Sequence, residues 1–566
     1  MIPSYTNESG FNPFSGPQLE AIIPLTDSQK EIWIATKIDD KSSLGYIESL
    51  SVHIRGDIKL NALHTAIEKL ISRHEILRST ISPDGTKLYI MSEYDNPPLV
   101  QNINTNDSHK IIKEEMNQSF DLIKGPLFRT RILCHDKDYC TLIISAHHII
   151  CDGWSLDTIL NDLSVLYTSC LNGNESEFLK PAPRFSEYVA IWHDKFQSEI
   201  KRCEIYWKTV LNGEIPSLDL PLDYKRPDIR TYRAESISLQ AENVFFSSLK
   251  TLSSKNNTSL FVTLLTAWAA TLSRISNQSD IIIGIPAAGQ PDMGMENLVG
   301  HCVSFLPIRI KIKNSDTFTV LLQKVKSSLY SAYEHRCLSF GRLIQIVNIP
   351  RNLSRIPLVS ASLTHTQKYT LDKIRFGNCT VDYYLNPRYH EIFEINLNAI
   401  ESSDGLRLLC HFNADLFNKD SVLKWLNELK ELIINVNNND NRLLRPSPDI
   451  RDSKHLSDLN KPLPENKFRN SLENALIQIW TDVLKVPVVN PDDNFFDIGG
   501  HSILLAEVQQ KINIQFERNV SMTELFQHPT VRLMAQHLSD MKTSTTDSSF
   551  SNARGLGKKQ RQFFQE

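Results

Sequence analysis

The sequence lacks several features that mark common classes of protein. Its nine cysteines are scattered, odd in number and without a CxxC pair, which argues against a disulfide framework and a zinc site, so we expect reduced thiols. No run of about 18 apolar residues occurs, and no basic segment followed by an apolar one opens the chain. The net charge is only -4 and the one basic stretch is a short tail, so we expect no nucleic-acid partner and no membrane partner. These absences favour a soluble, cytoplasmic protein.

The chain is long enough for several domain-sized units, with 566 residues of which 41% are hydrophobic and 22% charged. Residues 1–20 are polar and are predicted to form a flexible leader. From 21 to 445, short β-rich runs alternate with amphipathic stretches, which predicts a large α/β body. A stretch rich in charge and proline around 201–227 suggests a crossing between an N-lobe at 21–200 and a C-lobe at 201–445.

The C-terminal part of the sequence differs in character from this body. Residues 446–468 are polar, contain prolines at 446, 448, 462 and 464, and predict an interdomain linker. Residues 469–541 carry no cysteine and show short amphipathic helical patterns with an acidic balance, which predicts a small helical bundle. The basic tail at 542–566 is rich in serine and threonine, and we expect it to be disordered.

Two adjacent histidines follow an apolar run in the stretch SAHHIICDGWS, residues 145–155. The run is predicted to be a buried strand, and residues 154–170 carry apolar residues at helical spacing, so the histidines lie where a strand leads into a helix. Neighbours on an extended segment point in opposite directions, so only one of the pair can face a given cavity. An imidazole there can accept a proton from a nucleophile. A packed core pair and a half-formed metal site are the alternatives, although no third ligand stands at suitable spacing for a metal.

A serine opens a predicted helix in the stretch DNFFDIGGHSILLAEV, residues 493–508. One interpretation is that Ser502 is an ordinary helix N-cap. The other is a site of attachment, because free N–H groups and the helix dipole favour a phosphate at a helix N-terminus.

The histidine pattern HHIICDGWS resembles the HHxxxDG motif of condensation domains from nonribosomal peptide synthetases, which belong to the chloramphenicol acetyltransferase-like superfamily. Six further stretches resemble that family's motifs in the same order, namely LTDSQKEIW (25–33), RHEILRST (73–80), RFSEYVAIW (184–192), IGIPAAGQ (283–290), LVGHCVSFLPIR (298–309) and EHRCLSFGRLI (334–344). The resemblance covers about residues 22–445. It implies an α/β, V-shaped pseudodimer of two lobes with a tunnel between them.

The resemblance also implies roles for the residues of the histidine motif. His148 is implied to act in the tunnel, either as a general base or as a positioning and electrostatic group. His147 is implied to be buried and structural. The amide N–H of Gly153 is a candidate donor to an oxyanion, because a glycine lets the backbone approach a substrate closely.

The aspartate of the motif is implied to be structural and to pair with an arginine. Arg73 and Arg78 are both candidates, and the sequence does not separate them. The sequence departs from the family pattern at two places, because Gln290 stands where an arginine is usual and Ser304 where an asparagine is usual. These departures are compatible with an unusual donor, such as a polyketide acyl chain.

The second domain resembles a peptidyl carrier domain, a four-helix bundle with the motif FFxxGGxS. This resemblance implies that Ser502 carries a covalent 4'-phosphopantetheine arm. The expected partners are an upstream donor carrier protein, a trans-acting adenylation enzyme and a phosphopantetheinyl transferase, because the stretch between the two domains is too short to hold an adenylation domain.

Together the two resemblances predict a condensation and carrier didomain that joins a donor acyl or peptidyl thioester to an acceptor amine. Four alternatives remain at this stage: ester formation with a hydroxyl acceptor, epimerisation, transfer from acyl-coenzyme A, and a platform without catalysis that recruits carriers. The identities of donor and acceptor do not follow from the sequence.

Overall fold

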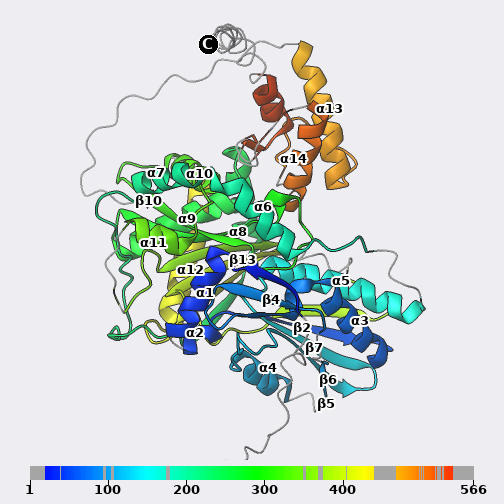
Figure 1. Ribbon diagram of the computed structural model, residues 1–566. Coiled ribbons are helices and arrows are strands. Elements are labelled where there is room, and N and C mark those ends of the chain that lie inside the picture. The colour runs from blue at the N-terminus through cyan, green and yellow to red at the C-terminus, as the bar shows by residue number, and fades with distance from the viewer. Residues whose placement is uncertain are drawn as a thin grey trace, which may run out of the picture.

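The computed structural model describes residues 19–38, 40–93, 97–103, 107–173, 179–347, 352, 354–367, 374–402, 405–438, 467–495, 498, 500, 502–516, 518, 520, 524–525 and 528–539. The predicted tail lies outside these residues. So do the predicted leader up to residue 18 and the predicted linker up to residue 466. The chain forms two α/β lobes followed by a helical unit, which confirms the predicted fold class (Figure 1).

The first lobe is built on a five-stranded sheet in the order β12-β2-β7-β6-β5, flanked by a three-stranded sheet in the order β1-β4-β3. Its strands are β1 (Leu19–Pro24), β2 (Ile47–Arg55), β3 (Ser79–Ile81), β4 (Lys87–Met91), β5 (Leu99–Asn102), β6 (Phe128–Asp136), β7 (Tyr139–His147) and β12 (Thr380–Leu385). Its helices are α1 (Asp27–Ile38), α2 (Asp40–Leu44), α3 (Leu60–Arg73), η1 (Glu75–Arg78), α4 (Ser108–Met116), α5 (Gly153–Asn172) and α6 (Phe185–Gln197).

The second lobe is built on a six-stranded mixed sheet in the order β10-β9-β11-β13-β14-β8. Its strands are β8 (Ala234–Gln240), β9 (Asp280–Ala288), β10 (Val303–Lys311), β11 (Ala361–Gln367), β13 (Ile395–Ser402) and β14 (Gly405–Asn413). Its helices are α7 (Ile200–Val210), α8 (Asn243–Lys255), α9 (Leu260–Ser276), η3 (Pro291–Met293), α10 (Phe318–Glu334), α11 (Phe340–Val347) and α12 (Lys419–Asn438).

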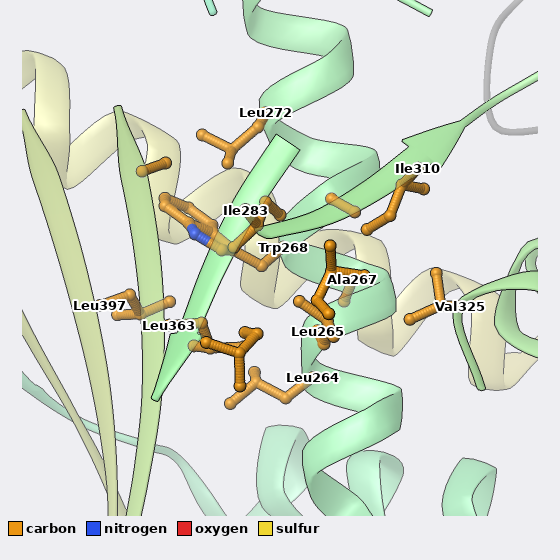
Figure 2. Close-up of a cluster of buried hydrophobic side chains, with 14 of the residues drawn as sticks. Leu264, Leu265, Ala267, Trp268, Leu272, Ile283, Ile310, Val325, Leu363 and Leu397 are labelled. Carbon is orange, nitrogen blue, oxygen red and sulfur yellow. The ribbon is translucent and has the colours of Figure 1, made fainter. Parts of the chain in front are cut away.

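Helix α9 is the centre of the second core because it is apolar on nearly every side. Ser259 caps it by accepting the N–H of Val262, and the helix then lies between the sheet and the helices α8, α10 and α12. Figure 2 shows Trp268 of α9 beside Ile283 of the sheet. Burying such large side chains contributes about 1.5–3 kcal/mol each.

The two lobes are not contiguous in sequence, which refines the predicted boundary at 200/201. The hydrophobic core changes between α6 and α7, since Trp207 of α7 lies in the second core. However, β12 pairs antiparallel with β2, and residues 295–302 also pack into the first core. Segments that follow the boundary therefore return to the first lobe and build the region between the lobes.

The cysteines depart from the sequence expectation at one place. Cys203 of α7 and Cys337, which follows α10, are joined in a disulfide, although reduced thiols were predicted for all nine. The two residues are 134 positions apart, so their contact depends on the packing of helices that sequence spacing does not reveal. The seven other cysteines are free.

The helical unit consists mainly of α13 (Lys467–Leu484), α14 (Ser502–Phe516) and a helix at residues 531–539. Its separate core contains Trp480, Phe495, Val508 and Met534 among others. Helix α13 therefore begins within the predicted linker. Among the described residues no single helix is long and apolar enough to cross a membrane, and α8 and α9 reach that length only as a pair bent by 109°.

Candidate active site

The histidine pair lies at the turn between β7 and α5. His147 is the last residue of the strand, and Asp152 is the N-cap of the helix, accepting the N–H of Ser155 at 2.8 Å. The predicted strand and helix are both present here. The turn is short, so the backbone fixes how the two imidazoles point.

His147 is completely buried in the first lobe. Its Nδ1 accepts the backbone N–H of Ile149 at 3.2 Å, which requires that nitrogen to be unprotonated. Burial, followed by the nearby His148 and Arg129, lowers the pKa of His147 to about 3. The side chain is therefore a neutral part of the core.

His148 points instead into the space between the lobes, with 24% of its side chain exposed. Its Nδ1 lies 2.7 Å from the carbonyl oxygen of Cys151. Because a carbonyl only accepts, Nδ1 carries the proton, and the Nε2 of the neutral ring is left as an acceptor. The ring also lies edge-on to the buried ring of His301, with 4.9 Å between centroids.

A partly buried ion pair lies beside His148. Glu48 of β2 places Oε1 3.8 Å from His148 Nδ1 and 2.5 Å from a guanidinium nitrogen of Arg388, which follows β12. Burial raises the pKa of Glu48, but Arg388 and His148 outweigh it, so the pKa lies below the usual range. His148 thus has an ionised carboxylate beside its protonated nitrogen.

Asp152 is held by four donors and by no arginine, so the predicted pairing with Arg73 or Arg78 is wrong. Its Oδ1 accepts the N–H and hydroxyl of Ser155, and its Oδ2 accepts Gln290 Nε2 at 2.9 Å and the N–H of Cys302 at 3.1 Å. These bonds join α5 of the first lobe to the segment between β9 and β10.

The two arginines are engaged elsewhere. Arg73 pairs with Asp162 at 2.8 Å, about 15 Å further along α5 than Asp152. Arg78 donates to Glu20 and to backbone carbonyls of α3 and β4. The carboxylate of Asp152 instead accepts from the neutral amide of Gln290.

A cavity of about 3050 Å³ lies between the lobes and is lined by residues of both, including His148, Gly153 and Ser304. Gly153 is the first residue of α5, so its N–H has no acceptor within the helix. A Cβ built on Gly153 would meet no protein atom within 4 Å. The backbone is therefore open to a molecule in the cavity.

The helical unit lies against the same cavity, where Leu484, Gly500 and Leu504 are among its lining residues. A further contact runs from Asn494 Nδ2 to the carbonyl of Thr258 at 3.3 Å. Gly500 is required for packing, since a Cβ there would lie 2.3 Å from Phe495. Ser502 is the first residue of α14, where free N–H groups suit a phosphate, but its side chain lies outside the described part of the chain.

Sequence reasoning missed several residues of the site. Glu48 and Arg388 stand in no quoted motif and meet only because β12 joins the first sheet. His301 stands in a quoted stretch, but nothing in its spacing indicated contact with His148. Asp157 lines the cavity one helical turn beyond Gly153, and burial, followed by the charge of Asp152, raises its pKa to about 7.

Two family models match this chain. The model of the condensation domain matches residues 19–449. The chain belongs to the condensation-domain family. The model of the phosphopantetheine attachment site matches residues 474–538, so the helical unit of this condensation-domain chain is a carrier domain. Both predicted resemblances are confirmed.

The curated relatives of the condensation and carrier domains are much longer proteins. A linear gramicidin synthase polypeptide of Brevibacillus parabrevis is 26% identical over 494 residues, which cover 84% of this chain and 10% of the relative. Malpinin synthetase of Mortierella alpina is 26% identical over 431 residues, which cover 74% of this chain and 6% of the relative. The chain therefore spans about a tenth or less of these two relatives.

Solved structures support the fold of the condensation domain. The condensation domain of the Monacolin K polyketide synthase MokA has a TM-score of 0.68 at 16% identity and covers 76% of this chain and 100% of its own. The four-domain nonribosomal peptide synthetase AB3403 has a TM-score of 0.69 at 20% identity and covers 77% of this chain and 34% of its own.

Proposed function

We propose that this chain forms an amide bond between a donor acyl or peptidyl thioester and an acceptor amine held on its own carrier domain. The observation that carries the proposal is that His148 of the catalytic turn and Gly500, two residues before Ser502, line one cavity. A carrier whose attachment loop opens onto the cavity of the condensing histidine is suited to deliver a substrate there.

His148 is proposed to accept the proton of the attacking amine at Nε2, or to orient that amine by the same hydrogen bond. The fixed tautomer supports this role, because Cys151 holds the ring proton on Nδ1. As the amine nitrogen bonds to the thioester carbon, the carbonyl oxygen becomes an oxyanion, and the open N–H of Gly153 is placed to donate to it. The thiolate of the donor then leaves, and the product remains on the acceptor.

Asp152 and His147 are proposed to act as supports. Asp152 holds the start of α5 to the segment that carries Gln290 and Cys302, so it keeps the catalytic turn in place between the lobes. His147 fills the core beneath that turn.

Ser502 is proposed as the residue that carries the 4'-phosphopantetheine arm. When bound, the arm holds a substrate as a thioester, which an amine can attack. Its attachment requires a phosphopantetheinyl transferase. Because the stretch between residues 449 and 474 is too short for an adenylation domain, we propose that a separate adenylation unit charges this carrier and that an upstream carrier brings the donor.

Intact-protein mass spectrometry tests this proposal. Incubation with a phosphopantetheinyl transferase and glycyl-coenzyme A should add one glycyl arm to the wild type and none to Ser502→Ala. Candidate acyl and N-acyl-aminoacyl thioesters on a separate carrier should then transfer their acyl group to the glycyl arm. Acylation of an arm that ends in a hydroxyl instead of an amine would indicate an ester-forming enzyme.

The charging step is tested in the same way. The chain with a free arm should load no amino acid from ATP and amino acids until an adenylation enzyme is added. Loading by the purified chain alone would overturn the proposal of a separate adenylation unit, and product found on the donor carrier would overturn the acceptor assignment.

A further inference from the structure

Three polar side chains form one row across the second-lobe sheet and line the cavity. Ser362 of β11 lies opposite Asn396 of β13, and Asn396 lies opposite His411 of β14. All three residues line the cavity that contains His148. Neighbouring members of the row are close enough to contact one ligand, since cross-strand partners on one face have Cβ atoms about 5 Å apart.

Each member of this row has a buried polar atom that finds no hydrogen-bond partner among the described residues, namely Ser362 Oγ, Asn396 Oδ1 and His411 Nδ1. Ser362 is 2% and His411 6% exposed. Leaving a buried polar group unpaired costs about 1–3 kcal/mol, so three neighbouring cases in one row are unusual for a wall that only supports the fold.

The neighbouring residues on the same strands are different. Thr366 of β11 donates its hydroxyl to Asn398 Oδ1 of β13 at 3.1 Å, and both residues line the cavity. Polar residues of this wall can therefore satisfy one another where no other partner is needed. The row of Ser362, Asn396 and His411 differs from this pair, because each of its three members keeps an unpaired polar atom.

The row is connected to the catalytic turn through charged groups. Asn396 Nδ2 donates to Glu391 Oε2 at 3.1 Å, and Glu391 lies 4.0 Å from Arg388, which pairs with Glu48 beside His148. Since the carboxylate of Glu391 only accepts, the amide of Asn396 must keep its Oδ1 turned away as the free acceptor. A ligand held by the row would lie in the same cavity as His148.

The row carries no charge and offers both hydrogen-bond donors and hydrogen-bond acceptors. Burial, followed by Arg388, lowers the pKa of His411 to about 3, so the ring is neutral. The row then offers one acceptor from Asn396, one hydroxyl that can donate from Ser362, and one ring nitrogen from His411. A secondary amide needs this combination, because its N–H donates and its C=O accepts.

We propose that Ser362, Asn396 and His411 form a subsite for a secondary amide of a thioester-bound chain. The N–H of the amide donates to Asn396 Oδ1, and its carbonyl accepts from the Ser362 hydroxyl. The three polar atoms are buried in this structure. The side chains of Ser362 and Asn396 therefore have to turn toward the ligand as it binds. The subsite deepens the proposed function, on which it depends for the identity of the chain that carries the amide.

Two sources could supply such an amide, namely the pantetheine arm and the substrate chain. Binding by isothermal titration to the full-length protein without an arm distinguishes them with three probes. The first is S-propyl pantetheine, which has only arm amides. The second is a long-chain methyl ketone with one internal amide, as a mimic of an amide-containing acyl donor. The third is the same ketone with the amide replaced by two methylenes.

Ser362→Ala should weaken the binding of one or both amide probes about tenfold and leave the amide-free ketone within about twofold. Thr366→Val is the matched control, because its hydroxyl already has a partner, and it should change none of the three affinities. A loss with the pantetheine probe alone assigns the subsite to the arm, and a loss with the ketone alone assigns it to the substrate.

The melting temperature of the protein without a bound probe provides a second measurement. Since the Ser362 hydroxyl has no partner, Ser362→Ala should leave the melting temperature unchanged or raise it. A lowered melting temperature would indicate a structural role and would overturn the subsite. So would equal losses for all three probes, unchanged affinities in Ser362→Ala, or no binding of either amide probe by the wild type. None of these measurements depends on turnover or on Ser502. The subsite can therefore be refuted without refuting the proposed function, and the mass-spectrometric test can fail without affecting the subsite.

Discussion

Two clusters of polar side chains around the cavity differ in how their hydrogen bonds are satisfied. On the first-lobe wall, Asp152 accepts from four donors and Glu48 is paired with Arg388. On the second-lobe wall, Ser362, Asn396 and His411 each keep one buried polar atom unpaired. The comparison indicates that the first wall is organised before a substrate arrives, whereas part of the second is completed by what enters. Groups that act on a reaction centre benefit from such preorganisation.

The largest expected effect comes from removing the imidazole of the first-lobe wall that points into the cavity. His148→Ala should lower the rate of condensation about 100-fold or more, because a positioned acid or base contributes about 10²–10⁴. The measurement is the rate of acyl transfer to a glycyl-loaded carrier, followed by intact-protein mass spectrometry. Melting and arm attachment should stay as in the wild type, and a near wild-type rate would show that His148 takes no part in the chemistry.

The next largest effect is expected from removing the carboxylate of Asp152, which holds the start of α5 in place. Asp152→Ala leaves the Gln290 amide and the N–H groups of Ser155 and Cys302 without their acceptor in a buried place. We expect a loss of about 3 kcal/mol in the free energy of unfolding, measured by urea denaturation, together with a loss of activity. Unchanged stability with lost activity would instead place Asp152 in direct contact with the substrate.

A pH comparison separates the two adjacent histidines. The unfolded chain binds a proton at His147 below about pH 6.5, whereas the native state holds its pKa at about 3, so stability falls as the pH drops from about 6.5 toward 3. His147→Asn keeps a side-chain acceptor but cannot titrate. The wild type should therefore lose about 2 kcal/mol more than this variant between pH 7 and pH 5, as measured by urea denaturation at each pH. Equal losses would show that His147 already titrates normally.

The sequence predicted the first wall better than the second for a physical reason. The turn from strand to helix is a local feature, so the spacing of the histidines, Asp152 and Gly153 was enough to place them at its ends. Two of the partners of Asp152, Gln290 and Cys302, lie 138 and 150 positions away, so local spacing could not identify them, and the predicted pairing with Arg73 or Arg78 was wrong. The row of Ser362, Asn396 and His411 depends on strand register in a sheet, which alternation along one strand does not fix.

The same limit applies to Glu48 and Arg388, which come together only through the pairing of β12 with β2. The start of a helix at Ser502 was predictable, since the two glycines and the following amphipathic helix are adjacent in sequence. That Gly500 lines the same cavity as His148 was not predictable, because it depends on how the carrier domain lies against the cavity.

The smallest expected effect tests whether the first wall uses its backbone as well as its side chains. The structure leaves open space around the Cα of Gly153, and alanine is a better helix former than glycine, so Gly153→Ala should leave the free energy of unfolding unchanged or raise it by a few tenths of a kcal/mol. If the N–H of Gly153 meets the oxyanion, the added methyl group lies where the substrate approaches, and transfer to the glycyl-loaded carrier should slow about tenfold, equivalent to about 1.4 kcal/mol. Lys208→Ala, at an exposed position of α7 outside the cavity lining, is the control for purification and assay. A Gly153→Ala enzyme with the wild-type rate would show that the substrate does not approach the start of α5, and the oxyanion donor would then have to be sought on the second-lobe wall.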